Sequence, residues 1–483
     1  MPDSAVRLDA VTFSYGAAAG DSLSDLELDL RPGEFVALTG PSGSGKTTLT
    51  RLINGLIPHY YEGVLSGKVL VNGVDPSSHA LWRLPVGSVF QNPRAQFFTT
   101  DTTSEIAFGA ENLGLEAAEI LRRVDAAIES MGLEELRDRS VFALSGGEKQ
   151  RVACASVAAV RPPIYVLDEP SANLDLESTQ QLRAIMATWK ASGATVVVAE
   201  HRLGYLRDLV DRVLIFADGR LRQELGGTDF RRLDEGQLRR LGLRCAWGRP
   251  LAVASQAPDR GYLEVSGLRC GYRRVGGSGL ATPRRRDVVG IDQLRIPKGA
   301  VTALVGANGA GKTTFAAWLG GLRRDRRGTL SDGGRVWKRS ERRRRVFLVS
   351  QDVNHQLFTE AVSTEIELAL RLASPDSGLP APDAAAIMNQ LDISDLAGRH
   401  PLSLSAGQKQ RVVVAAALAS GREVVVLDEP TAGLDLGHMT AVAKALRDLA
   451  DGGRTVVVAT HDADLVAACA DNIVRLDHGS LAN

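Results

Sequence analysis

Cysteine, net charge and long apolar runs are all scarce in this chain of 483 residues. Its four cysteines lie far apart, with no CxxC pair and no histidine cluster beside them, which argues against disulfide, zinc and iron–sulfur frameworks. Lysine plus arginine equals aspartate plus glutamate at 57 each, so the basic excess typical of nucleic-acid binding is missing and we expect no nucleic-acid partner. No apolar run approaches the roughly 18 residues needed to span a bilayer, and residues 1–4 predict no signal peptide.

The most informative stretch is Gly40–Thr48, GPSGSGKTT, which follows the apolar segment Phe35–Leu38 and precedes a segment of helical character. A strand, a glycine-rich turn, Gly-Lys-Thr and a helix are the context of a phosphate-binding loop. Glycines let backbone N–H groups surround phosphate oxygens, and the helix N-terminus adds its positive dipole end. Lys46 would reach the β- and γ-phosphates, and the Thr47 hydroxyl would bind Mg²⁺. The expected nucleotide-binding residues are Gly40, Ser42, Gly43, Gly45, Lys46, Thr47 and Thr48.

The same arrangement recurs at Gly306–Thr314, where Thr313 takes the Mg²⁺-binding place of Thr47. Four further positions repeat at a constant offset of 260 residues: Gln91 and Gln351, Ser145 and Ser405, Asp168 and Asp428, and His201 and His461. These matches establish an internal duplication. The second set of expected nucleotide-binding residues is Gly306, Asn308, Gly309, Gly311, Lys312, Thr313 and Thr314.

Strand-like and helix-like segments alternate in each half, which indicates an α/β fold with a mostly parallel sheet. Residues 6–14 and 26–30 alternate apolar and polar side chains and therefore predict an antiparallel flap. We expect a first domain at 1–225, a linker at 226–260, where no strong periodicity is found, and a second domain at 261–483.

Each half contains an apolar strand that ends in a pair of carboxylates, Asp168-Glu169 and Asp428-Glu429. The end of a strand beside a phosphate loop is where an aspartate can hold Mg²⁺, so Asp168 and Asp428 are predicted metal ligands. The next residue projects differently and can polarise the attacking water. We therefore predict Glu169 and Glu429 as general bases.

The segment Leu144–Arg151, LSGGEKQR, combines a helix start with exposed backbone donors. Ser145 followed three residues later by Glu148 is a capping box. The two glycines behind the cap leave N–H groups open at the positive end of a helix, where an anion can bind. A well-capped helix start without a ligand is the alternative. The second half has LSAGQKQR at Leu404–Arg411, in which Ala406 replaces the first glycine.

The phosphate loop, LSGGE or LSAGQ, and LDEP together resemble the ATP-binding cassette (ABC) ATPases, twice and over nearly the whole chain. The resemblance implies an enzyme that hydrolyses ATP with Mg²⁺. It also implies two P-loop NTPase domains, each with a mostly parallel sheet core, an antiparallel β flap and a helical subdomain. It further assigns two tyrosines that stack on adenine, two glutamines that bind Mg²⁺ and sense a membrane partner, and two histidines on the γ-phosphate: Tyr15 and Tyr272, Gln91 and Gln351, His201 and His461.

By the same resemblance the two domains pair within one chain and enclose two ATP molecules head to tail. The serine and glycines of each half would complete the ATP site of the other half: Ser405 and Gly407 the site of Lys46, and Ser145, Gly146 and Gly147 the site of Lys312. Both halves keep the full set of site residues, so we expect both to hydrolyse ATP. The departures are Ala406 and Glu148, which leave asymmetry open.

The glutamine stretches narrow the type within the family. QNPRAQFF at 91–98, EIAFGAEN at 105–112, EHRL at 200–203 and QDVNHQLFTE at 351–360 resemble the ATPases of energy-coupling factor (ECF) transporters. The resemblance implies uptake of a vitamin, a vitamin precursor or a metal ion, with an integral membrane scaffold and a small substrate-binding membrane subunit as partners. The chain would then lie at the cytoplasmic face of the cell membrane. The loop at 57–63 further resembles fused ATPases, some of them assigned to uptake of the thiamine precursor hydroxymethylpyrimidine.

Two alternatives stay open: the tandem ATPase of a sugar or nucleoside importer, and a soluble tandem-cassette translation factor acting on ribosomes. The latter typically has a longer basic linker and Asn-His-Leu-Asp in its D-loop, whereas this chain has ANLD at 172–175 and AGLD at 432–435. The arginine run at 342–345 is predicted as a solvated edge, with contact to anionic headgroups as the alternative.

Overall fold

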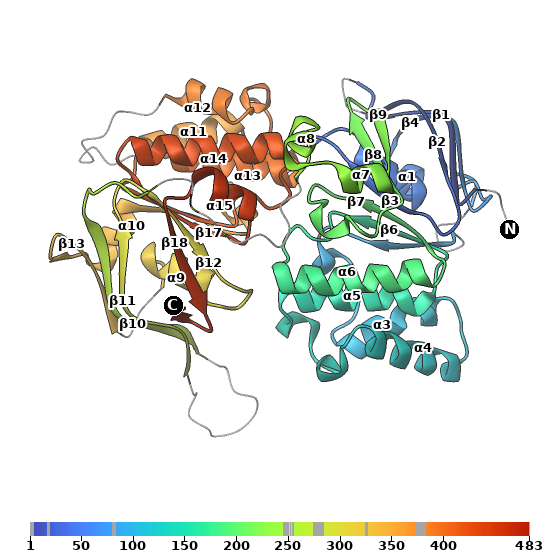
Figure 1. Ribbon diagram of the computed structural model, residues 1–483, viewed down its shortest axis with the longest axis horizontal. Coiled ribbons are helices and arrows are strands. Elements are labelled where there is room, and N and C mark those ends of the chain that lie inside the picture. The colour runs from blue at the N-terminus through green and yellow to red at the C-terminus, as the bar shows by residue number, and fades with distance from the viewer. Residues whose placement is uncertain are drawn as a thin grey trace. The chain divides into compact units, whose positions relative to one another are not determined.

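The computed structural model describes residues 4–16, 20–79, 84–244, 251, 253, 256–273, 285–323, 327–372 and 383–482, with the side chains of 272, 273, 285 and 286 excepted. The chain divides into two compact units, unit 1 at Met1–Trp247 and unit 2 at Gly248–Asn483. In Figure 1 unit 1 runs from blue to green and unit 2 from yellow to red. Each unit contains one six-stranded sheet and one smaller sheet, so the predicted α/β class is confirmed.

The larger sheet of unit 1 has the strand order β5-β6-β7-β3-β8-β9. Its neighbours pair in parallel except β8 and β9, which form an antiparallel hairpin. Parallel neighbours need crossover connections, and helices supply them here. The strands are β3 (Phe35–Thr39), β5 (Val86–Val89), β6 (Ile164–Asp168), β7 (Thr195–Ala199), β8 (Arg212–Ala217) and β9 (Arg220–Gly226).

The smaller sheet of unit 1 is the predicted antiparallel flap, in the order β2-β1-β4. Strand β2 begins at Leu23, earlier than the sequence pattern indicated, because Leu23 and Leu26 both point into the core. The flap strands are β1 (Val6–Tyr15), β2 (Leu23–Leu30) and β4 (Gly63–Val71).

Helices cover the two faces of the larger sheet (Figure 1). Successive residues of β3 alternate between two cores, since Phe35 and Ala37 pack with α3 to α6 whereas Val36 and Leu38 pack with α1 and the flap. The helices are α1 (Lys46–Ile53), α2 (Leu56–His59), α3 (Thr102–Asn112), α4 (Ala117–Ser130), α5 (Gly146–Val160), α6 (Leu176–Ala191), α7 (Gly227–Arg232) and α8 (Glu235–Arg240).

Unit 2 repeats this plan, with the larger sheet in the order β15-β16-β17-β12-β18-β19 and the flap in the order β11-β10-β13-β14. Its strands are β10 (Tyr262–Arg273), β11 (Arg285–Pro297), β12 (Val301–Val305), β13 (Arg327–Asp332), β14 (Arg335–Val336), β15 (Val346–Val349), β16 (Val424–Asp428), β17 (Thr455–Ala459), β18 (Asn472–Asp477) and β19 (Ser480–Leu481). Its helices are α9 (Lys312–Leu319), α10 (Arg339–Arg345), α11 (Val362–Arg371), α12 (Ala384–Gln390), α13 (Ala406–Ala419), α14 (Leu436–Asp451) and α15 (Ala463–Cys469).

The first part of the expected linker belongs to unit 1. Helices α7 and α8 lie there, and Phe230, Leu238 and Leu243 are buried in the same core as α5 and α6. Unit 1 therefore extends to Trp247, beyond the boundary at residue 225.

The arginine run at 342–345, predicted as a solvated edge, is exposed only in part. It forms part of α10, where Arg342 is buried with its guanidinium over the Trp318 ring and donates to the Trp318 carbonyl. Arg345 pairs with Glu423. One face of the run therefore packs inward, and only Arg343 and Arg344 remain exposed.

Candidate active site

The two phosphate loops have the same geometry. Each lies between a buried strand and a helix whose N-cap glycine, Gly45 or Gly311, has a φ of 101°. A side chain at Gly40 would place its Cβ 2.0 Å from the Phe216 carbonyl oxygen, so only glycine lets the loop pass β8. The chain reversal, and with it the ring of backbone N–H groups, depends on these glycines.

The loop lysines are buried and turn back over the loop. Lys46 donates from Nζ to the carbonyl oxygens of Gly40 (2.9 Å) and Pro41 (2.8 Å). Lys312 does the same to Gly306 (2.6 Å) and to the next carbonyl (3.1 Å). Neutral carbonyls are weaker acceptors than phosphate oxygens, so both ammonium groups are placed to exchange partners when a nucleotide enters.

Two of the three predicted metal ligands, the threonine and the aspartate, lie together in each unit. Thr47 Oγ1 is 3.2 Å from Asp168 Oδ1, and Thr313 hydrogen-bonds Asp428 in the same way. Burial, followed by the charge of Glu169, raises the pKa of Asp168 to about 7. Burial likewise raises the pKa of Asp428 to about 6. Each carboxylate thus lacks sufficient compensating positive charge, which a cation could provide.

These oxygen donors suit Mg²⁺, which prefers a few protein oxygens together with water and substrate phosphates. Within the described residues no group of three or more His, Cys, Asp or Glu side chains could hold a metal ion on its own. The hydroxyl and carboxylate oxygens of each unit fit a cation that also binds nucleotide phosphates. Thr47 with Asp168, and Thr313 with Asp428, would hold it, and the cation would neutralise phosphate charge.

The two candidate general bases share an unusual backbone. Glu169 and Glu429 have left-handed φ values of 44° and 52°, and each donates its N–H to an alanine carbonyl at the end of the neighbouring strand (2.8 Å). Such a conformation costs on the order of 1 kcal/mol in a residue other than glycine. It turns the glutamate side chain away from the direction of the preceding aspartate, as the sequence had suggested.

In unit 1 the structure brings together three predicted site residues. Gln91 donates from Nε2 to Glu169 Oε2 (2.6 Å), and His201 Nε2 lies 3.3 Å from Glu169 Oε1. Both oxygens of the carboxylate are therefore engaged, one by the glutamine loop and one by the histidine that follows β7.

The cluster in unit 2 is different. His461 Nδ1 lies 2.9 Å from Glu429 Oε1, and the second carboxylate oxygen accepts from Thr460 Oγ1 (3.2 Å). Gln351 is exposed and makes no side-chain hydrogen bond to any described residue. The glutamine is thus part of the cluster in unit 1 but not in unit 2.

The predicted adenine-stacking residues are placed only in part. Tyr15 closes β1 beside α1, where its hydroxyl lies 3.3 Å from Thr48 Oγ1 and accepts from Arg51. Its ring makes an edge contact with Tyr61, from the predicted 57–63 loop. The side chain of Tyr272 lies outside the described residues, as does Cys245.

The LSGGE and LSAGQ segments begin helices as predicted. Ser145 with Glu148 caps α5, and Ser405 with Gln408 caps α13, each as a complete capping box. Gly146 has open space around the position of a Cβ, whereas a Cβ on Gly147 would meet Ser178 Oγ at 2.3 Å.

Sequence reasoning missed a buried carboxylate that ties the D-loop to the segment around each histidine. In unit 1 Glu200 accepts from Ser171 Oγ (2.6 Å) and from the His201 N–H (2.8 Å). In unit 2 Asp462, two residues further along, accepts from Thr431 Oγ1 (2.5 Å). The acid before the histidine in EHRL was visible, but its partner depends on the neighbouring strand.

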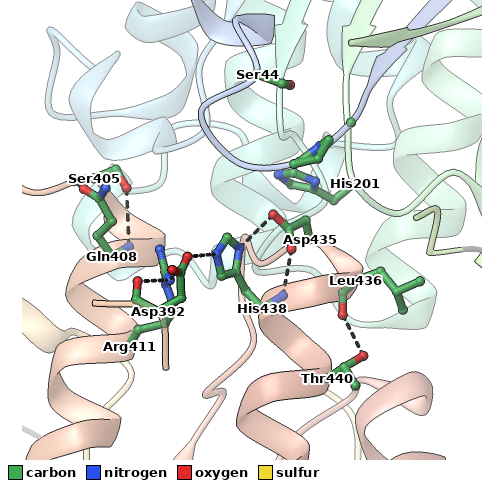
Figure 2. Close-up of polar contacts among 12 residues, drawn as sticks. Ser44, His201, Asp392, Ser405, Gln408, Arg411, Asp435, Leu436, His438 and Thr440 are labelled. Carbon is green, nitrogen blue, oxygen red and sulfur yellow. Dashed lines mark hydrogen bonds and ion pairs between the residues drawn. The ribbon is translucent and has the colours of Figure 1, made fainter. Parts of the chain in front are cut away.

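Unit 2 also contains a chain of charged groups at the start of α14 (Figure 2). His438 Nδ1 lies 2.7 Å from the N-cap Asp435, and its Nε2 lies 3.4 Å from Asp392. Arg411 on α13 reaches the same Asp392 oxygen (3.3 Å). The D-loop aspartate is thereby linked to the helical layer, which no predicted residue had indicated.

Comparison with known proteins agrees with this geometry. The family model for ABC transporter matches residues 23–172 and 291–432. A Treponema denticola protein carrying the name ABC transporter ATP-binding protein is 40% identical over 99% of this chain and 96% of its own length. A Methanosarcina acetivorans protein of the same name is 35% identical over 99% of this chain and 85% of its own.

Among solved structures, a model of ribosome-bound archaeal Pelota and ABCE1 matches with a TM-score of 0.69 and 23% identity, covering 98% of this chain and 78% of that one. At this identity the likeness shows the fold alone. No helix in the described part of the chain is long and apolar enough to cross a membrane. With its phosphate loops, Mg²⁺-suited carboxylates and family match in both units, this chain belongs to the ABC transporter ATP-binding family, as a tandem ATPase that uses ATP and Mg²⁺.

Proposed function

We propose that the chain is the ATP-hydrolysing subunit of an ECF-type importer that takes up a vitamin, a vitamin precursor or a metal ion. It would act at the cytoplasmic face of the membrane with an integral scaffold and a small substrate-binding subunit. One observation carries this proposal: both units present a phenylalanine to solvent at the end of the glutamine loop. Phe98 is 72% exposed and Phe358 is 76% exposed.

Hydrogen bonds from the backbone to a buried glutamate fix the segment that carries each phenylalanine. Glu105 on α3 is buried and its Oε2 accepts from the N–H groups of Phe98 (2.9 Å) and Thr99 (2.8 Å). Glu365 on α11 holds Phe358 by the same contact (3.0 Å). In each unit a buried carboxylate orders the backbone that carries an exposed apolar side chain. This arrangement favours a docking role for the side chain over chance exposure.

A second exposed apolar residue occurs at equivalent positions in the two helical layers. Phe142 is 79% exposed just before the Ser145 cap, and Leu402 is 54% exposed just before the Ser405 cap. The same pair of exposures in both units supports two apolar contact surfaces for a membrane partner, one for each unit.

The proposed hydrolytic roles are those that the family resemblance implies, and the contacts within each unit support part of them. Lys46 and Lys312 would bind the β- and γ-phosphates, with the ring of loop N–H groups around them. Glu169 and Glu429 would accept a proton from the attacking water, and His201 and the equivalent His461 would orient the γ-phosphate. Tyr15 and Tyr272 would stack on adenine, and Gln91 and Gln351 would join the Mg²⁺ ligands.

The general-base assignment is tested with the double variant Glu169→Gln plus Glu429→Gln. We expect kcat for ATP hydrolysis to fall by about 10²–10⁴, the usual contribution of a positioned base, while ATP binding persists. Wild-type turnover in the assembled complex would contradict the assignment.

The importer role is tested by purifying the tagged chain from detergent-solubilised native membranes and identifying what accompanies it by mass spectrometry. We expect a polytopic scaffold and a small integral substrate-binding protein. The variant Phe98→Ala plus Phe358→Ala should lose both. Tyr60→Ala is the matched control, because Tyr60 is also an exposed aromatic residue, at 73%, but lies outside the glutamine loops.

Two outcomes would contradict the ECF-importer proposal, and a third would contradict only the docking role of the two phenylalanines. Ribosomal proteins without any integral protein would favour the translation-factor alternative. A periplasmic-type sugar-binding system would favour the sugar-importer alternative. Retention of the membrane partners by the phenylalanine double variant would remove the docking role of Phe98 and Phe358.

A further inference from the structure

The two candidate general bases are held by different second donors. In unit 1 the second carboxylate oxygen of Glu169 accepts from Gln91, which lies on a partly exposed loop. In unit 2 the corresponding oxygen of Glu429 accepts from Thr460, which is 1% exposed at the end of β17. The candidate base in unit 2 is therefore held by a buried residue rather than by one on a partly exposed loop.

The hydrogen-bond pattern fixes the direction of the Thr460 proton. Its hydroxyl oxygen accepts from the N–H of Asp462 at 3.0 Å. A threonine hydroxyl has one proton to donate, and the carboxylate of Glu429 at 3.2 Å is its acceptor. His461 Nδ1 lies 2.9 Å from the other oxygen, so both oxygens of the Glu429 carboxylate contact side chains of two consecutive residues.

Unit 1 cannot make this contact. The position equivalent to Thr460 is Glu200, a carboxylate that accepts hydrogen bonds and is already used by Ser171 and by Tyr205. In unit 2 the task of holding the D-loop hydroxyl passes to Asp462, which frees position 460 for a donor. The buried acid thus occupies the position of Thr460 in unit 1, as Glu200, and lies two residues later in unit 2, as Asp462. This difference makes the two sites chemically different.

We propose that Thr460 is a positioning residue for ATP hydrolysis in unit 2, which orients the Glu429 carboxylate toward the attacking water. The inference rests on the proposed role of Glu429 as general base. Removing the hydroxyl would take away the hydrogen bond that Thr460 donates to the Glu429 carboxylate and so weaken the hold on its orientation. The effect falls on kcat, because the contact reaches neither the loop N–H groups nor the residues assigned to adenine.

The test compares Thr460→Val, which keeps the shape and loses the hydroxyl, with Thr460→Ser, which keeps the hydroxyl and loses a methyl group. Steady-state ATPase activity of the full chain is measured in the wild-type background and in a Glu169→Gln background. We expect the valine variant to lower kcat about tenfold with KM unchanged, as for a lost bond to a charged group. The serine variant should keep at least half of the parent kcat.

The two backgrounds cover both ways in which the sites can work. If they turn over independently, the Glu169→Gln chain reports unit 2 alone and shows the full effect. If they are strictly coupled, Glu169→Gln is itself inactive and the full effect appears in the wild-type background. Thr455→Val is the matched control, since Thr455 is a buried threonine at the start of β17, the strand that Thr460 directly follows, and its hydroxyl accepts from the Gly299 N–H. This variant should leave kcat unchanged.

Two results would overturn the inference: a valine variant with parent kcat in both backgrounds, or a serine variant that falls as far as valine, which would indicate packing. Failure of the underlying base assignment is recognised separately. In that case Glu429→Gln alone would leave kcat unchanged, whereas an active base with an indifferent Thr460 would refute only the positioning role.

Discussion

Replacing Asp428 by asparagine should stabilise unit 2 of the nucleotide-free protein at neutral and alkaline pH. Asp428 is buried at 2% exposure, and burial raises its pKa to about 6, from an ordinary value of 3.8. Below pH 3.8 the carboxyl is protonated in both states and costs nothing. As the pH rises toward 6 the unfolded chain ionises first, so wild-type stability falls through this window and stays low above it.

The size of the effect follows from the pKa difference. A shift of this size corresponds to about 3 kcal/mol at full ionisation, which is an upper limit because the hydrogen bond from Thr313 is retained by the amide only in part. We expect Asp428→Asn to gain about 2–3 kcal/mol over wild type at pH 8 and only about 0.5 kcal/mol at pH 4. ATP with Mg²⁺ should stabilise the wild type more than the variant, because the variant has lost a metal ligand.

The stability difference would be measured by urea unfolding monitored through hydrogen exchange in peptides from β16 and β17, since those strands report on unit 2 alone. Asp471→Asn is the control with the opposite sign: it is a buried aspartate of the same unit that accepts from Arg447 (2.6 Å) and from the Val301 N–H (2.8 Å), so its loss should destabilise. An Asp428→Asn variant less stable than wild type at pH 8 would refute the reasoning.

Two further predictions concern packing. Gly146→Ala should leave stability unchanged or raise it by up to about 1 kcal/mol. Gly147→Ala should cost about 1–3 kcal/mol, because its Cβ would meet Ser178 Oγ. Thermal melting of the two variants checks this order of stability, and equal melting temperatures would contradict it. Arg342→Ala should cost unit 2 about 2–3 kcal/mol, because the contacts with the ring and carbonyl of Trp318 are both lost. Urea unfolding followed by tryptophan fluorescence measures this loss, and a cost below about 0.5 kcal/mol would mean that the buried guanidinium contributes little.

Much of the site could be predicted because it is local in sequence. The phosphate loops, the capping box of Ser145 and the Asp168-Glu169 pair each consist of residues a few positions apart, so spacing alone indicates the geometry. The duplication could be predicted for the same reason, since equal offsets need no knowledge of the fold. The role of Lys46 as a loop lysine therefore needed only the strand and helix on either side.

The contacts that escaped prediction are those between strands. Thr460 reaches Glu429 only because β16 and β17 are neighbours in the sheet, and Glu200 reaches Ser171 for the same reason in unit 1. Strand order is a property of the whole fold, so the sequence shows a polar residue at the end of a strand but not its partner.

Two other differences had a local signal that was overlooked. The arginine run at 342–345 places its first and last members on one helical face, which in this chain packs toward Trp318 and Glu423. The expected linker contains Asp234 and, three residues on, Gln237, a capping box that opens α8. The arginine run was predicted to be exposed because of its charge, and the segment from 226 was predicted as a linker because it lacks a long periodic pattern, although short helical signals were present in both.

Comparison of the two units shows which contacts of the site occur in both, even where different residues make them, and which contacts differ. A buried carboxylate holds the D-loop hydroxyl in both units, yet it comes from Glu200 in one and Asp462 in the other. What is retained is therefore an acceptor at a point in space. The second donor to the base is not retained in this sense: Gln91 lies on the loop that presents Phe98, whereas Thr460 is buried directly after the central strand β17. A partner that moves the glutamine loops would therefore shift Glu169 of unit 1 directly, through its hydrogen bond with Gln91. Among the residues that the structure describes, Glu429 of unit 2 has no such bond to Gln351, so its position would change only if the surrounding sheet and helices moved.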